Sequence, residues 1–135
     1  MAERHFTPEE ANELLEQVRP LVESLVAHRR SFTVVAARRA RLSLRISGNG
    51  GDFDPQEPSE LEVQLEAEAE AVARTVEALQ GLGVLVKDLD RGLVDFPALR
   101  NGEEVLLCWQ VGEDEIAYWH GLEEGFAGRK PLPLD

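Results

Sequence analysis

The side chains best suited to chemistry lie near the end of the chain, between Ile116 and Arg129. His120 is followed by two adjacent carboxylates, Glu123 and Glu124, so an imidazole and two carboxylates fall within five residues. These groups could bind a divalent metal ion. The chain has only 3 histidines and no H-E-x-x-H motif, however, so the spacing does not define a complete zinc site.

Residues elsewhere in the sequence could join this segment once the chain folds. Asp95 and Glu113 could supply further oxygen ligands, and Arg129 could bind a carboxylate or phosphate through two parallel hydrogen bonds. The structural alternative is a histidine at the end of a strand, with His120 bonded to a backbone carbonyl or to Asp95. In that alternative, Arg129 pairs with one of the two adjacent carboxylates.

Other classes of chemistry have little support. Cys108 is the only cysteine, which excludes an internal disulfide and a Cys-rich zinc site. No histidine lies close to it in sequence, so we interpret it as a small buried hydrophobe. The 26 acidic residues produce carboxylate pairs by chance, so they do not identify a glycosidase. The segment from Gly125 to Arg129 lacks the G-K-[ST] ending of a phosphate-binding loop.

The charge of the chain restricts its partners. A formal net charge of -12 at pH 7 disfavours nucleic acids, because their binding depends on neutralising phosphates with Lys and Arg. No apolar run approaches the ~20 residues of a membrane span, and the start, M-A-E-R-H-F-T-P-E-E, is unlike a signal peptide. With a single cysteine, these features predict a cytoplasmic protein that binds neither nucleic acid nor a membrane.

The N-terminal third of the chain is predicted to form one long helix, from about residue 7 to Ile46. The stretch T-P-E-E is typical of a helix start, with Thr7 and Glu10 forming a capping box. Residues of one face then recur at spacings of three and four. They are Ala11, Leu14, Val18, Leu21, Leu25, His28, Phe32, Val35, Arg39, Leu42 and Ile46.

A loop and a second helix should follow. The glycine-rich and proline-containing stretch at 47–58 predicts a loop. Ser59, with Glu62 as its capping-box partner, predicts the start of a helix at 59–81 that Gly81 and Gly83 end. So short a connection predicts that the two helices fold back antiparallel.

Opposite charges should pair within this hairpin. Six arginines between Arg29 and Arg45 would lie beside the glutamates between Glu60 and Glu70. Each exposed ion pair stabilises the hairpin by only ~0–1 kcal/mol, but the opposite charges fix how the two helices pair and in which direction. His28 and Arg39 lie on the apolar stripe and are expected to meet a carboxylate of the second helix or of a neighbouring subunit. Two helices cannot cover a stripe this long, so we expect a dimer through the helices, unless the sheet covers one end.

From Val84 onward the pattern changes to that of short strands, and 84–132 should form a β-meander with a closing loop. Runs at 84–86 and 93–97 come first, and Pro97 should end its strand or put that strand on an edge of the sheet. Asn101-Gly102 predicts a two-residue hairpin turn into the main strand, 104–111, and 115–119 returns. We expect a three- or four-stranded antiparallel meander, and one α+β domain over 1–135.

Alternation assigns side chains to the two faces of this sheet. In the main strand, one face should hold Val105, Leu107, Trp109 and Val111, and the other Leu106, Cys108 and Gln110. In the returning strand, Trp119 should face opposite to Ile116, Tyr118 and His120.

Several motifs resemble those of a family of small uncharacterised bacterial proteins, a domain of unknown function. They are F-T-x-E-E-A-N from Phe6, R-G-L-V-D-F-P from Arg91, C-W-x-x-G-E from Cys108 and Y-W-H…G-F-A-G-R from Tyr118. The resemblance covers essentially the whole chain and implies no activity. It implies that the family pattern, as a ligand site or as a network that closes the fold, includes Asp95, Trp109, Glu113, Trp119, His120, Phe126 and Arg129.

These observations favour a non-enzymatic, homo-oligomeric interaction or scaffold module, because most of the sequence builds a charged amphipathic hairpin without a catalytic motif. The alternative is a small-ligand or divalent-metal binding protein, enzymatic or not, with its site on the C-terminal sheet. No cofactor is implied. The ligand-binding candidates are Asp95, Trp109, Glu113, Trp119, His120 and Arg129, and the metal candidates are His120, Glu123 and Glu124.

Overall fold

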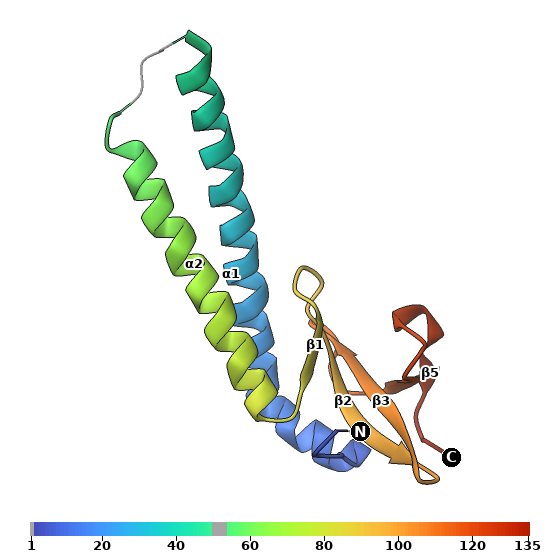
Figure 1. The fold of residues 1–135 in the computed structure, drawn as a ribbon. Helices are drawn as coiled ribbons and strands as arrows, with labels where there is room; N and C mark the ends of the chain where they lie inside the picture. The colour runs from blue at the N-terminus through green and yellow to red at the C-terminus, as the bar shows by residue number, and fades with distance from the viewer. Residues whose placement is uncertain (1, 50–53) are drawn as a thin grey trace.

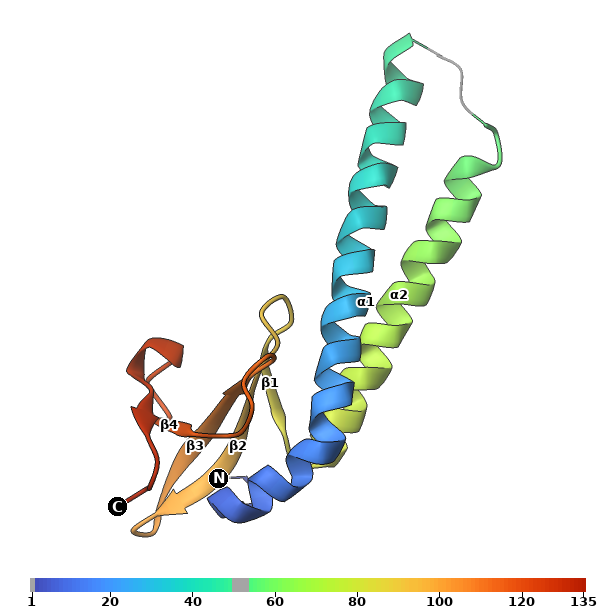
Figure 2. The same cartoon turned by 180° about the vertical axis from the view of Figure 1, so that it is seen from behind.

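The computed structural model describes residues 2–49 and 54–135 and confirms the α+β fold. Two helices, α1 (Pro8–Asn49) and α2 (Glu57–Gly81), form an antiparallel hairpin, and a five-stranded antiparallel sheet follows (Figure 1). The sheet lies beside one end of the hairpin, and the other end projects away from it (Figure 2). Neither described helix combines the length and the apolar character needed to cross a bilayer.

Helix α1 begins as predicted, with a capping box. The Thr7 N–H donates to Glu10 Oε1 (2.8 Å), and the Glu10 N–H donates to Thr7 Oγ1 (3.1 Å). Pro20 lies inside the helix, where it removes one helical hydrogen bond. Accordingly, the N-terminal part of α1 turns away from the axis of the remainder, towards the sheet (Figure 1).

The ends of the two helices at the projecting tip differ from the prediction. Helix α1 continues past Ile46 to Asn49, and α2 begins at Glu57. The prediction of Ser59 as the N-cap is therefore wrong. Asp54 holds this start instead, since its side chain accepts from the Gln56 N–H (2.9 Å) and its carbonyl from the Glu57 N–H (3.0 Å). The predicted loop residues 50–53 lie outside the described residues.

The sheet is a meander of five strands rather than three or four, in the order β1-β2-β3-β4-β5. The strands are β1 (Leu85–Asp88), β2 (Leu93–Arg100), β3 (Glu103–Gln110), β4 (Tyr118–Gly121) and β5 (Lys130–Pro131). A single 3-10 turn, η1 (Phe126–Gly128), precedes β5. The Asn101-Gly102 turn between β2 and β3 is confirmed, with φ angles of 52° and 81°.

Pro97 neither ends β2 nor puts that strand on the edge of the sheet, because β2 continues to Arg100 and lies between β1 and β3, so both alternatives of the prediction are wrong. Strand β1 pairs with β2 only as far as Leu85 opposite Asp95, which leaves Pro97 without a β1 partner. The Pro97 carbonyl instead accepts from the Phe6 N–H of the N-terminal segment (2.7 Å). Since the N–H and C=O of a strand residue point to the same side, the missing N–H of Pro97 costs the β2–β3 ladder nothing.

The returning strand begins later than predicted because α1 holds the residues before it. Asn12 Oδ1 accepts from the Ile116 N–H (2.8 Å), and Asn12 Nδ2 donates to the Ile116 carbonyl (3.2 Å). Ile116 is therefore outside β4 and buried in the core, not on the face of Tyr118 and His120 as expected. Trp119 lies opposite those two residues, as predicted.

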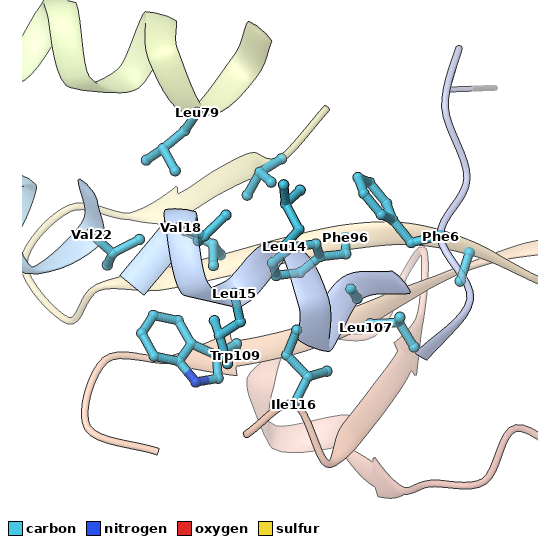
Figure 3. Packing of buried hydrophobic residues seen from close by; sticks show 14 of the residues in the cluster. Phe6, Leu14, Leu15, Val18, Val22, Leu79, Phe96, Leu107, Trp109 and Ile116 are labelled. Carbon is cyan, nitrogen blue, oxygen red and sulfur yellow. The ribbon is translucent and has the colours of Figure 1, made fainter. Parts of the chain in front are cut away.

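One main core joins the sheet to the sheet-proximal end of the hairpin. Leu14, Val18 and Val22 of α1 and Leu79 of α2 pack with Phe96 and Trp109 of the sheet (Figure 3). The prediction that Val105, Leu107, Trp109 and Val111 share one face is confirmed, and that face is the one towards the core, since the first three belong to this core and Val111 packs against it. In the projecting part of the hairpin, a separate small cluster contains Val35, Leu42 and Leu61.

Ion pairs connect the two helices as expected from their charges. His28 Nδ1 lies 2.7 Å from Glu68 Oε2, and Arg39 Nη2 lies 3.0 Å from Glu62 Oε2. Both polar residues of the apolar stripe therefore meet a carboxylate of α2. Because these ion pairs are partly exposed, they add little to the stability of the hairpin and serve mainly to fix the antiparallel direction of the two helices.

Candidate functional site

The outer face of the sheet, opposite the helices, carries a buried group of three ionisable side chains: Asp95, Cys108 and His120. Their positions follow from the register of the strands. The Asn101-Gly102 turn sets Arg100 opposite Glu103, which places Asp95 of β2 directly opposite Cys108 of β3. His120 of β4 pairs with Leu106, two residues from Cys108 on the same face. The exposed fractions of Asp95, Cys108 and His120 are 2%, 2% and 4%.

Hydrogen bonds fix the orientation of the His120 ring. Nδ1 lies 2.8 Å from the Gly121 carbonyl, and Nε2 lies 3.2 Å from each carboxylate oxygen of Asp95. A carbonyl can only accept, so Nδ1 carries a proton and Nε2 faces Asp95. One further proton is then shared between Nε2 and the Asp95 carboxyl. His120 therefore makes both of the contacts that were expected for a histidine at the end of a strand, one to a backbone carbonyl and one to Asp95.

Burial disfavours the charged forms of the acidic members of this group. It raises the pKa of Asp95, although the neighbouring His120 acts in the opposite direction. Burial also raises the pKa of the Cys108 thiol to about 12, and the negative charge of Asp95 adds to this effect. Cys108 is thus a protonated thiol at neutral pH, and its 2% exposure agrees with its interpretation as a small buried hydrophobe.

A cavity with a volume of about 150 Å³ adjoins the three side chains. Residues of the strands line one side of this cavity, and Leu122, Glu124 and Phe126 of the loop after β4 line the other side. Glu124 closes this loop, since it accepts from the Gly121 N–H (2.8 Å) and binds Lys130. The closing loop therefore lies over the polar group.

A second polar cluster surrounds Arg129. Its Nη2 lies 2.8 and 2.9 Å from the two carboxylate oxygens of Glu113, and its guanidinium stacks on the rings of Tyr118 and Phe126 at 4.1 and 4.5 Å. The expectation that Arg129 pairs with Glu123 or Glu124 is therefore wrong. The reason is tertiary, because the turn that carries Glu113 folds back against the closing loop.

The turn at Glu113 is held from the helix side as well. Arg19 of α1 donates to the Glu113 and Asp114 carbonyls (2.9 and 2.7 Å), and Trp109 Nε1 donates to the Glu113 carbonyl (3.1 Å). Arg129 and Glu113 thus close the fold and do not line the cavity beside His120.

The remaining candidates are distributed over other places. Trp109 and Trp119 lie on the opposite face, in the main core. Glu123 is exposed, and Glu124 borders the cavity but is engaged with Gly121 and Lys130. Of the six ligand-binding candidates, the cavity brings together Asp95 and His120.

Cys108 is the member of the group that sequence spacing did not identify. Its Sγ, a His120 nitrogen and an Asp95 oxygen all lie within 4.8 Å of one another. Imidazole nitrogen, thiolate sulfur and carboxylate oxygen are the ligand atoms that proteins use for zinc. Chemically, the arrangement can hold a metal ion or keep a shared proton in a buried place.

The projecting part of the hairpin offers a second candidate surface. A hollow of about 460 Å³ lies between the helices, with Val34 and Val35 of α1 on one side and Ala67 of α2 on the other. A smaller hollow of about 220 Å³ continues from it past Gln64, which lines both. We call these two hollows the hairpin groove.

The two walls of the hairpin groove carry opposite charges. On α1 the wall has Arg30 and Arg38, and neither forms an ion pair with any residue that the structure describes. On α2 the wall has Glu57, Glu60 and Glu68. Val34 is 51% exposed beside these charges.

Comparisons with known proteins give a family and no activity. A family model described as an uncharacterized conserved protein (DUF2203) matches residues 4–132. No curated protein and no solved structure matches the chain. The match spans both helices and all five strands, including the sheet residues that form the buried group and the Arg129 cluster. The chain is therefore a member of the DUF2203 family of uncharacterized conserved proteins.

Proposed function

We propose that the protein is a cytoplasmic, non-enzymatic interaction module that works as a homodimer through its helical hairpin. The observation that carries this proposal is the uncovered apolar surface on the projecting part of the hairpin. The buried cluster there has three members, Val35, Leu42 and Leu61, whereas Val34 and Leu44 are 51% and 73% exposed. A second surface laid over these side chains would remove apolar area from water and stabilise the hairpin.

The occupant that fits the hairpin groove is a second copy of the chain. The groove has a basic wall on α1 and an acidic wall on α2, so its own surface is the complement that it needs. Arg30 and Arg38, which make no ion pair among the described residues, would gain carboxylate partners from the other copy.

The charges also select the symmetry of this dimer. A two-fold axis parallel to the hairpin brings α1 of each copy onto α2 of the other, so each basic wall meets an acidic wall. An axis across the hairpin would bring α1 onto α1 and oppose arginines, which disfavours it. The proposed assembly is therefore a four-helix arrangement with both hairpin tips at one end and both sheets at the other.

Size-exclusion chromatography with light scattering tests the assembly. We expect the full chain to be a dimer at micromolar concentration and V34E to be a monomer that stays folded. The matched control is L99E, since Leu99 is also an exposed apolar residue (44%) but lies on β2, away from the hairpin. A wild-type monomer, or a dimer that V34E leaves intact, would refute the proposal.

Cross-linking tests the symmetry separately. Ser47 is exposed near the tip of α1, and the native cysteine, Cys108, is buried. A short bis-maleimide should join S47C chains into covalent dimers and leave the wild type unchanged. A light-scattering dimer of S47C without cross-linking would contradict the parallel axis.

A second candidate function, small-ligand or divalent-metal binding on the sheet, is favoured by one specific observation. The cavity of about 150 Å³ adjoins buried Asp95, Cys108 and His120, three groups that a fold does not need to bury together for packing alone. Zinc titration of the purified chain, as described below, tests this candidate independently of the dimer.

A further inference from the structure

We propose that Asp95, Cys108 and His120 form a binding site for a divalent transition-metal ion, with Zn²⁺ as the best match. This inference rests on the second candidate function and gives it a ligand set and a class of metal. It does not depend on the dimer, because all three side chains come from the sheet of one chain.

The chemistry of the three groups selects the metal. The set has one sulfur, one nitrogen and one oxygen donor, all within 4.8 Å of one another. Mg²⁺ and Ca²⁺ require mainly oxygen ligands, so a thiolate and an imidazole exclude them as preferred ions. Zn²⁺ accepts this combination and is bound by three protein ligands in sites that keep one position open.

The charges of the group balance those of a divalent ion. Bound as ligands, Asp95 and Cys108 each carry one negative charge and His120 is neutral, so a divalent ion makes the buried site neutral as a whole. Without the metal, the group holds two removable protons, one on the thiol and one between His120 and Asp95. Binding releases both protons to water, so charge is conserved.

His120 is already oriented for this role. Its Nδ1–H donates to the Gly121 carbonyl at 2.8 Å, and Nε2 faces the Asp95 carboxylate at 3.2 Å. Ligand histidines in metal sites commonly donate their other N–H to a carbonyl or carboxylate in this way, since the bond fixes the tautomer and the ring. Glu124 Oε1 in turn accepts from the Gly121 N–H at 2.8 Å. The closing loop therefore fixes Gly121, whose carbonyl orients the His120 ring.

The cavity supplies the open coordination position. It lies against all three ligands and is bordered on the loop side by Leu122 and Phe126. Its volume of about 150 Å³ exceeds the space that a single water molecule occupies in the liquid, roughly 30 Å³. A metal-bound water or a small anion therefore has room beside the ion.

The test is zinc and cobalt binding by the purified full chain after treatment with a chelator. We expect one Zn²⁺ per chain with a Kd of about 1 μM or tighter. Co²⁺ should give a tetrahedral visible spectrum and a near-ultraviolet thiolate-to-cobalt charge-transfer band. C108A and C108S should abolish that band and weaken Zn²⁺ binding by about 100-fold or more.

A matched control separates the site from general binding by histidines and carboxylates. His28 also pairs with a carboxylate, that of Glu68 at 2.7 Å, but no cysteine accompanies it. We therefore expect H28Q to bind Zn²⁺ and Co²⁺ as the wild type does. Circular dichroism and tryptophan fluorescence of each variant establish that it is folded.

The outcomes either support or overturn the inference. It is overturned if the wild type binds no Zn²⁺ in this range or gives no thiolate band with Co²⁺, and this result needs no variant to fold. Unchanged binding by folded C108A or C108S also overturns it, as does an equal loss in H28Q. If light scattering shows a monomer, the proposed dimer is refuted, but the proposed metal site is not affected.

Discussion

Gly92 provides a direct test of how the sheet is packed against the hairpin. It lies in the turn between β1 and β2, with a φ of +66°. Its carbonyl accepts from the Val111 N–H at 2.9 Å, so the turn is attached to the end of β3. A Cβ added there would lie 2.7 Å from Val111 Cγ1 and 2.9 Å from Val26 Cγ2, closer than real side chains approach.

The size of the effect of G92A follows from three terms, two that destabilise and one that stabilises. The left-handed backbone disfavours alanine by about 1–2 kcal/mol, and forcing a methyl group into packed valines adds about 1–3 kcal/mol. Alanine restricts the unfolded chain and returns about 0.4–1 kcal/mol. We therefore expect G92A to lower the free energy of unfolding by about 1–4.6 kcal/mol.

G102A is the matched control for the backbone term. Gly102 also has a positive φ, +81°, but no atom lies within 4 Å of a Cβ added to it. Its loss should be about 1 kcal/mol or less, from the backbone alone. The difference between the two variants measures the packing of Val111 and Val26 around the β1–β2 turn.

Urea unfolding followed by tryptophan fluorescence is the appropriate assay, since Trp109 is fully buried in the main core. All variants should be compared at one protein concentration, because a dimer would couple stability to concentration. Equal midpoints and slopes for G92A and G102A would show that Val111 and Val26 move aside without any loss in the free energy of unfolding. That result would refute the close approach of the turn to α1 and β3.

Two further predictions concern the polar residues of the sheet. In metal-free protein, the raised pKa of Asp95 means that its stabilisation is complete below the unfolded value, pH about 4, and is lost as pH rises through the folded value. D95N should therefore remove this decline from urea midpoints measured with EDTA across pH, and an unchanged slope would contradict the assignment. R129A should lower the free energy of unfolding by about 2 kcal/mol, because it removes the Glu113 pair and the stacking on Tyr118 and Phe126. R129K should restore little of this loss in the same assay; full recovery would show that charge alone matters.

The hairpin and the sheet could be predicted because local patterns determine them. The spacing of three and four from Ala11 to Leu42 specifies a helix whatever surrounds it, and the Asn101-Gly102 turn requires positive φ angles. The start of α2 could not be predicted in the same way. Ser59-x-x-Glu62 satisfies the capping pattern, but Asp54 begins the helix earlier through its own hydrogen bonds.

The returning strand shows a limit of a different kind. Alternation from 115 to 119 suggests a strand, yet Asn12 binds the Ile116 backbone and removes that residue from the sheet. Asn12 is about one hundred positions away in sequence and belongs to the F-T-x-E-E-A-N motif. A contact of this separation has no local pattern, so the position of His120 on β4 followed only from the tertiary structure.

The pairing of Asp95 with Cys108 could nevertheless be predicted from the sequence. A two-residue turn at Asn101-Gly102 pairs Arg100 with Glu103, and counting outward from that pair puts Asp95 opposite Cys108. The absence of a histidine near Cys108 in the sequence does not indicate what surrounds it, because the neighbours of a strand residue lie on the adjacent strands. Register brings ligands together across strands, so neighbours in space are found by pairing and not by spacing.

The motif residues of the sheet therefore divide into two kinds with different requirements. Arg129 pairs with Glu113 and donates to the Cys108 carbonyl through Nη2, and these contacts close the loop onto the sheet. Asp95 and Cys108 lie on neighbouring strands, and Asp95 also bonds to His120 of β4. Burial raises the pKa of both groups, so it disfavours their charged forms. An apolar pair at these two positions would serve the fold at lower cost, so the proposed metal site would give the carboxylate and the thiol beside an oriented imidazole a reason that packing does not.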